Sequence, residues 1–420
     1  MTVVHSNHLY GQQTLLTIEN MSFSGRTLEQ FPEFIRAAAQ VKEAAAEANA
    51  QCGQLDRTVA DRIVQACHVL ENCDHIDQFP VDVFQGGGGT GTNMNLNEVL
   101  SSLAGEGVDG LDHINLSQST SDVCHTAMRL ALYGQSHVVT GRVGVLMGEL
   151  RRLAEDNTGV DTIARTCVQD GMAVPVSKLF DALAGILGTL LEDYSSVNQQ
   201  LLDVNIGGTV IGSGFGASLA YRQAVVPHLA TITGLPVTAA PDMYAVTQYP
   251  IDLARVSAVL TMISRVLAKF SQDLRLLSSG PDCGFNEIHL PATQKGSSYY
   301  PGKINPVIPE TFLQCDLLVS ANDSIIQRCL GMGEQYYNLW DCTMGFLLLD
   351  NVRMLGKAVE LLTEKCVAGI EVNTEVCQAY ATSTMPRLLQ LKEEIGYQAT
   401  TDGIAKEGAE AFLRRHSETA

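Results

Sequence analysis

The chain is short of positive charge and of aromatic side chains. Among its 420 residues, 27 are Lys or Arg and 46 are Asp or Glu, which gives a formal net charge of −19. Such a surface repels nucleic-acid phosphates and anionic lipid headgroups, so we expect neither a nucleic-acid nor a membrane partner. Aromatic residues make up 6% of the chain and include a single Trp, so we expect a core of aliphatic side chains, which suits helices.

The sequence also lacks paired cysteines and long hydrophobic runs. Its 11 cysteines are scattered from Cys52 to Cys377 without a CxxC pair, so a disulfide framework or a zinc site is not indicated. We therefore expect reduced, mostly buried thiols and no metal. Residues 1–10 show no basic segment followed by an apolar core, and no apolar run reaches the roughly 18 residues of a membrane span. These features predict a cytoplasmic protein.

Helical periodicity dominates the chain. Apolar residues recur at steps of three and four over four long stretches, which predicts long helices that pack as a bundle in a mostly α protein. These stretches are residues 126–153, 179–201, 256–274 and 309–330. We place domain boundaries near residues 110 and 365. The prediction is an N-terminal mainly helical domain (1–110), a central helix-bundle domain (111–365) and a small C-terminal helical domain (366–420).

Loops rich in Gly and Ser separate the predicted helices, and loops of this kind often carry chemistry. They cover residues 85–92, 115–122, 207–218 and 280–306. The four glycines at 86–89 could suggest a phosphate-binding loop. However, no GxxxxGK[ST] pattern is present and no strand clearly precedes them. A hinge or a close approach of the backbone to a neighbour is the better interpretation.

The most informative segment is residues 296–306, which read GSSYYPGKINP. It places Ser297, Ser298, Lys303 and Asn305 between glycines and prolines. The glycines let backbone N–H groups approach a ligand, and the lysine supplies the positive charge that an acidic protein needs to hold a carboxylate. An ordinary exposed loop between two helices has a similar composition, so composition alone leaves both interpretations open.

This segment resembles the signature loop GSSxMPxKxNP of the aspartase/fumarase superfamily and departs from it at Tyr300. Residues 89–98 resemble the first family block, and residues 118–122 with 126–128 resemble the second, in the expected order. Shorter aspartase-like stretches occur at residues 78–83, 205–209 and 273–281.

The resemblance implies a three-domain, mostly α fold with a long central helix bundle. It implies a homotetramer whose core is built from four subunits and whose active sites draw on several chains. It further implies a lyase that acts on a small dicarboxylate to give fumarate without a cofactor.

The resemblance also assigns roles within the loop. Ser297 would be the catalytic base, acting as an alkoxide in a loop that closes over the substrate. A serine hydroxyl is a poor base in water, so Lys303 and nearby N–H groups must favour its ionised form. Lys303 and Asn305 would hold one substrate carboxylate. The charge that develops on the carboxylate next to the reacting carbon needs donors that are already in place.

The other substrate-binding positions follow from the remaining blocks. By resemblance, Ser119, Thr120 and Ser298 would hold the second carboxylate, and Thr90 and Thr166 would complete the lining of hydroxyl groups. Taken alone, such residues are more often helix caps and turn residues. Within the matched blocks we favour the binding role.

Two departures from the family bear on the leaving group. Ser121 stands where relatives usually carry Asn, and a shorter hydroxyl leaves more room and offers fewer donors. Cys167 stands where fumarases have His and aspartases have Gln or His. In fumarases that His contacts the counterpart of Glu310, which we take as a supporting residue. A thiol cannot replace an imidazole, so we favour Cys167 as a small pocket-wall residue. His125 follows the second family block closely in sequence, but a structural role is favoured for it.

The predicted function is therefore a carbon–nitrogen lyase, with aspartate converted to fumarate and ammonia. A related lyase acting on nitrosuccinate or an N-substituted aspartate is the alternative, and fumarase is less favoured because the His is missing. A non-enzymatic alternative is an inactive structural relative, since a lens crystallin arises from this superfamily. The joint presence of Ser297, Lys303 and Asn305 argues against that alternative.

Overall fold

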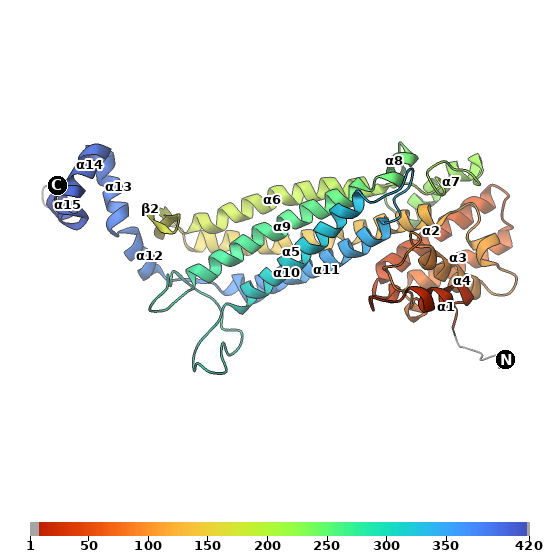
Figure 1. Ribbon diagram of the computed structural model, residues 1–420, viewed down its shortest axis with the longest axis horizontal. Coiled ribbons are helices and arrows are strands. Elements are labelled where there is room, and N and C mark those ends of the chain that lie inside the picture. Colours follow the sequence, from red (N-terminus) through yellow and green to blue (C-terminus); the bar gives the residue numbers. More distant parts are fainter. Residues whose placement is uncertain (1–7, 418–420) are drawn as a thin grey trace. The chain divides into compact units, whose positions relative to one another are not determined.

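The computed structural model describes residues 8–417, and the chain is 67% helical (Figure 1). Residues 1–7, part of the segment in which the sequence shows no signal-peptide pattern, lie outside the described residues. The helices are α1 Gln12–Met21, α2 Pro32–Gln51, α3 Arg57–Glu71, α4 Thr90–Ala104, α5 Thr120–Asp156, α6 Ser177–Gln199, α7 Leu219–Thr233, α8 Met243–Gln248, α9 Ile251–Leu277, α10 Val307–Leu330, α11 Asp341–Lys365, α12 Thr374–Ala381, α13 Thr384–Ile395, α14 Tyr397–Glu407 and α15 Ala409–Ser417. Six short strands pair as β1 Asp161–Thr166 with β2 Gln169–Pro175, β3 Asp203–Val204 with β4 Thr238–Ala239, and β5 Ile288–His289 with β6 Glu371–Val372.

The mostly α class and the four long helices predicted from periodicity are confirmed. The stretches at 126–153, 256–274 and 309–330 lie in α5, α9 and α10, and the stretch at 179–201 lies in α6 except for its last two residues. Helix α9 ends at Leu277, shortly before Gly280 and Pro281, two residue types that commonly follow the end of a helix. Across the described residues, no helix is both long enough and apolar enough to cross a membrane.

The chain forms two compact units. The first comprises Met1–Thr140, Glu192–Met262 and Leu318–Met354, and the second comprises Gly141–Leu191, Ile263–Leu317 and Leu355–Ala420. The boundaries fall inside α5, α6, α9, α10 and α11, so each long helix contributes residues to both units. The predicted domain boundaries near residues 110 and 365 stay a prediction.

The first unit combines a helical N-terminal region with one part of each long helix. Helix α2 carries a run of small, fully buried alanines, which let α3 and α7 pack closely against it. Among the long helices, Arg129 of α5 pairs with Asp252 of α9 and Asp341 of α11 at 2.6 and 3.1 Å. Arg129 and Asp341 are buried and Asp252 is partly buried, so these ion pairs connect the three helices.

The second unit contains a hairpin that sequence reasoning missed. Strands β1 and β2 pair antiparallel, and α12 packs against them. On this hairpin, Thr162 Oγ1 and Arg165 Nη1 both donate to the buried carboxylate of Glu287, at 2.5 Å each. A small cluster of buried apolar residues holds α13 and α15 together, formed by Leu388, Leu391, Phe412 and Leu413.

The expectations for cysteine and glycine hold in the structure. All eleven cysteines are free thiols in the structure, and seven of them are buried, which confirms that the thiols are mostly buried. In the glycine-rich loop, a Cβ on Gly89 would lie 3.0 Å from Cys342 Sγ, and one on Gly91 would lie 2.1 Å from Gln85 Oε1. The close approach of the backbone to its neighbours therefore explains these glycines.

Candidate active site

In the first unit, Asp122 anchors the turn that carries Ser119. The Asp122 carboxylate is fully buried and accepts backbone N–H groups from Ser119, Gly207 and Thr209 at 2.8, 3.1 and 3.0 Å. Burial raises the pKa of Asp122 to about 6, although the three N–H donors act in the opposite direction. This carboxylate thereby joins two stretches, 118–122 and 205–209, that are far apart in sequence.

An amide network joins the start of α4 to the start of α5. Asn93 Nδ2 donates to Asn115 Oδ1 at 3.0 Å and lies 3.3 Å from Thr120 Oγ1. The buried Lys42 of α2 donates to the same Asn115 oxygen at 2.9 Å. Thr120 is the first residue of α5, so this network places its hydroxyl relative to the first family block.

Thr90 and Ser121 occupy different environments in this unit. Thr90 is exposed at the first position of α4, and its hydroxyl donates to Gly87 O at 2.7 Å. Ser121 is 2% exposed, and its hydroxyl adjoins that of Tyr337. Burial raises the pKa of Tyr337, so its hydroxyl stays protonated. A longer side chain at position 121 would meet Tyr337 directly.

His125 is enclosed between Asp341 and Tyr337, and its structural role stays a prediction. It is 1% exposed, its Nδ1 lies 3.6 Å from Asp341 Oδ2, and its ring stacks on Tyr337. Burial lowers its pKa, the nearby Arg129 acts in the same direction, and Asp341 opposes both.

In the second unit, the oxygen of Ser297 is held by backbone donors. The N–H groups of Tyr299 and Tyr300 donate to Ser297 Oγ at 3.0 and 2.9 Å. Donors of this kind favour negative charge on the oxygen that accepts them. Ser297 is partly exposed and Ser298 is exposed, so both hydroxyls are accessible from solvent.

The loop closes on itself at its two ends. The Gly296 N–H donates to Lys303 O at 3.0 Å, and Asn305 Nδ2 donates to Gly296 O at 2.5 Å. A Cβ at position 296 would lie 2.2 Å from Lys303 O, so this position requires glycine. The Lys303 side chain is exposed, with Nζ 5.5 Å from the centre of the Tyr300 ring.

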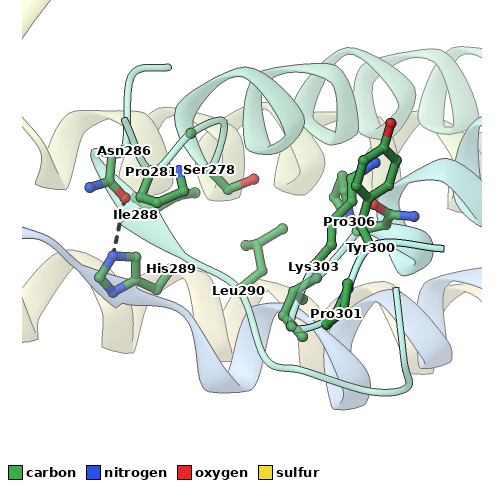
Figure 2. Close-up of a pocket in the computed structure, with 14 residues that line it drawn as sticks. Ser278, Pro281, Asn286, Ile288, His289, Leu290, Tyr300, Pro301, Lys303 and Pro306 are labelled. Carbon is green, nitrogen blue, oxygen red and sulfur yellow. Dashed lines mark hydrogen bonds between the residues drawn. The ribbon is translucent and has the colours of Figure 1, made fainter. Parts of the chain in front are cut away.

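Lys303 and Asn305 line a cavity of about 620 Å³ within the second unit. Figure 2 shows Lys303, Tyr300 and Pro306 on one side of Leu290, with Asn286, Pro281 and Ser278 on the other. Helix α10 begins at Val307, directly after the loop, so the positive end of its dipole adds to the charge of Lys303. The cavity therefore suits a small anionic molecule.

The remaining predicted residues of this unit lie elsewhere. Glu310 is in the first turn of α10, 3.5 Å from Arg275 Nε. Thr166 ends β1, and Cys167 and Val168 form the tight turn to β2 with φ values of 52° and 60°. Left-handed backbone is costly for a β-branched residue such as Val168, so the turn is strained. Cys167 is exposed at the tip of this turn and is not among the described residues that line the cavity.

The predicted site residues thus fall into separate groups. In the first unit the described contacts connect the blocks that carry Thr90, Ser119, Thr120 and Ser121. In the second unit one loop carries Ser297, Ser298, Lys303 and Asn305, followed by Glu310, while Thr166 and Cys167 lie at the hairpin turn. Neither Ser297 nor Ser298 is among the described residues that line the cavity.

Several residues of these groups were missed at the sequence level. Ser278 lines the cavity and belongs to the aspartase-like stretch 273–281, so a signal for it was present. Asp122 lies inside the second family block, but its anchoring role depends on the distant residues 207 and 209. Lys42 had no sequence signal, because a lysine on an amphipathic helix is ordinarily exposed.

Comparison with known proteins matches the chain to one family. The chain matches the lyase family over residues 2–318. It is 36% identical to the aspartate ammonia-lyase of Helicobacter pylori over 408 residues, covering 95% of this chain and 87% of that protein. The aspartate ammonia-lyase of Corynebacterium glutamicum is also 36% identical, over 420 residues that cover 97% of this chain and 79% of that protein.

Solved structures agree with the sequence relatives. A fumarate lyase:delta crystallin from Brucella melitensis, bound to cobalt, superposes with a TM-score of 0.93 at 34% identity, covering 98% of this chain and 92% of that one. A class II fumarase from Schistosoma mansoni gives a TM-score of 0.93 at 26% identity, covering 99% of this chain and 93% of that one. Nearly the whole chain is matched in both sequence and fold, and it therefore belongs to the lyase family of the aspartase/fumarase superfamily, within which it is aspartase-like.

Proposed function

We propose that this protein is a carbon–nitrogen lyase that converts aspartate to fumarate and ammonia. The observation that carries the proposal is the loop at 296–306, where two N–H groups point at Ser297 Oγ. The same loop presents Lys303 and Asn305 to a cavity at the N-terminus of α10. The aspartate ammonia-lyases that match nearly the whole chain support the choice of substrate.

The chemistry proceeds by proton removal and loss of ammonia. Ser297, ionised to an alkoxide, takes a proton from the carbon next to one substrate carboxylate. The electron pair moves onto that carboxylate and is stabilised there by donors already in place. It then returns to form the carbon–carbon double bond as the C–N bond breaks and ammonia leaves. Lys303 and Asn305 hold one carboxylate, and the hydroxyls of Ser119, Thr120 and Ser298 hold the other, with Thr90 and Thr166 lining the site.

Replacing the base tests this assignment. Ser297→Ala should lower kcat by a factor on the order of 10² to 10⁴, because general-base catalysis contributes about that much. Fumarate formation would be followed by its ultraviolet absorbance, with Thr293→Ala as the matched control. Thr293 is an exposed residue just before the loop, so that variant should keep full activity. Full activity of Ser297→Ala would remove Ser297 from its role.

A second candidate is a related lyase with another leaving group. Ser121 and Cys167 favour it, because relatives carry larger donors at these positions. A panel of aspartate, malate, nitrosuccinate and N-substituted aspartates separates the candidates by the substrate that is turned over fastest. Ser121→Asn should change the ranking among amine substrates, since the new amide meets Tyr337. If none of the panel yields fumarate, both enzymatic proposals fail and the inactive structural relative remains.

We also propose that the protein works in the cytoplasm as a homotetramer with active sites shared between subunits. Large apolar side chains exposed on α6, α9 and α10 support an interface along these helices. They are Ile186, Met262, Leu276, Leu317, Leu318 and Ile325, with exposed fractions of 45–69%. The free thiols agree with a reducing compartment.

Shared sites can be tested by mixing two inactive variants. Ser297→Ala and Thr120→Ala change residues of different units, so co-expression should regenerate some intact sites if each site uses several chains. Recovered activity should be a sizeable fraction of the wild-type value, whereas each variant alone stays inactive. Absence of recovery in a mixed tetramer would contradict shared sites, and a monomer in light scattering would contradict the assembly.

A further inference from the structure

A cluster of possible metal ligands lies between α2 and α3, among residues that the proposed chemistry does not use. Glu43 comes from α2, and His68 and Glu71 come from α3, where a spacing of three residues puts them on one face. One ligand atom from each residue lies within 4.8 Å of the others. His68 Nε2 is 3.2 Å from Glu43 Oε1, so the imidazole already faces the carboxylate.

Two carboxylate oxygens of this cluster are buried without donors. Glu43 is 8% exposed, and its Oε2 has no hydrogen-bond partner among the described residues. The same holds for Oε1 of Glu71 within that part of the chain. Arg36 is close, but its Nε donates to the Glu71 main-chain oxygen and its Nη2 to Cys73 Sγ. Buried acceptors left in this state cost free energy unless a proton or a cation joins them.

The electrostatics of the pair agree with a missing positive charge. The two carboxylates of this cluster carry up to two negative charges. A divalent cation would cancel that charge, whereas a shared proton would cancel half of it.

We propose that Glu43, His68 and Glu71 bind a divalent transition-metal ion of the zinc type. One imidazole nitrogen and two carboxylate oxygens form a donor set that suits Zn²⁺. The His68 side chain is 49% exposed, which gives the ion a path from solvent and leaves room for a water ligand. The ion would join α2 to α3 and so stabilise the helical hairpin that packs against α4.

Calorimetric titration of the full-length, untagged protein with Zn²⁺ tests the site. The wild type should bind one equivalent per chain that Glu71→Gln and His68→Gln each weaken by at least about 10- to 100-fold. His137→Gln is the matched control, because His137 is an exposed histidine of α5 outside the cluster. It should bind Zn²⁺ as the wild type does. The wild type and all these variants keep the eleven cysteines, so any binding of Zn²⁺ by thiols is the same in each of them.

The thermal midpoint gives a second readout that is independent of the lyase activity. Zn²⁺ should raise Tm in the wild type and in His137→Gln but leave Glu71→Gln and His68→Gln unchanged. Equal Zn²⁺ affinity in the site variants would assign the ion to other ligands, and a wild type that binds no Zn²⁺ would mean that a shared proton joins the two carboxylates. Either result overturns the proposal. Since His68 is half exposed, His68→Gln should fold even if a substitution at Glu71 does not.

Discussion

Lys42 offers a quantitative test of how the first unit is built. Its side chain is fully buried and donates to Asn115 Oδ1 at 2.9 Å. Burial lowers its pKa from 10.5 to about 7, although Cys124, Asp122 and Cys67 act in the opposite direction. Lys42→Met removes the titrating group while keeping a side chain of similar length in the same space. Asn115 Oδ1 would still accept from Asn93.

The magnitude of the pH dependence of stability follows from the difference between the pKa values of Lys42 in the unfolded and folded chain. In the unfolded chain the lysine keeps its proton up to about pH 10.5, whereas in the folded chain it releases it near pH 7. Between these values the unfolded state binds more protons, so the stability of the wild type rises with pH. The full difference corresponds to about 5 kcal/mol, and the slope approaches about 1.4 kcal/mol per pH unit well above pH 7.

Guanidinium denaturation at pH 7.5, 8.0 and 8.5 measures this slope. The free energy of unfolding of the wild type should rise relative to that of Lys42→Met by about 1 kcal/mol over this range. The stability of Lys42→Met relative to the wild type is therefore greatest at pH 7.5. Both proteins contain the same cysteines, so the contribution of the thiols to the pH dependence is largely removed by taking the difference. Lys269→Met, which changes an exposed lysine of α9, should run parallel to the wild type. Parallel profiles for the wild type and Lys42→Met would refute the depressed pKa.

Two further predictions concern buried ion pairs. Arg129→Met leaves the carboxylates of Asp252 and Asp341 without their cation and should lower the free energy of unfolding by about 3–5 kcal/mol. A loss below about 1 kcal/mol in denaturant titration would show that water or a proton compensates easily. Arg165→Met likewise leaves Glu287, 2% exposed, with an uncompensated charge. Hydrogen exchange should then accelerate across β1 and β2, and unchanged protection there would contradict a stabilising role for this pair.

The sequence was sufficient where the information is local or where a motif is long. The helices α5, α6, α9 and α10 follow from apolar residues that repeat every three or four positions, because such a stripe must be buried whatever covers it. The loop at 296–306 was found from its residue types in order, and this pointed to proton abstraction beside a carboxylate. The motif did not show that the Tyr299 and Tyr300 N–H groups donate to Ser297, since that depends on backbone dihedrals.

Other features depend on partners distant in sequence, and only the tertiary structure decided them. The β1–β2 hairpin escaped prediction because its turn is Cys167-Val168 rather than the usual Asn-Gly, so its strained backbone must be held by contacts such as Arg165 with Glu287. The burial of Lys42 arises where α2 meets Asn115, from a segment more than seventy residues away. Local sequence determined the four long helices and indicated which loop carries the proposed base. Packing decided which charges are buried, and burial sets their pKa values and their need for a partner.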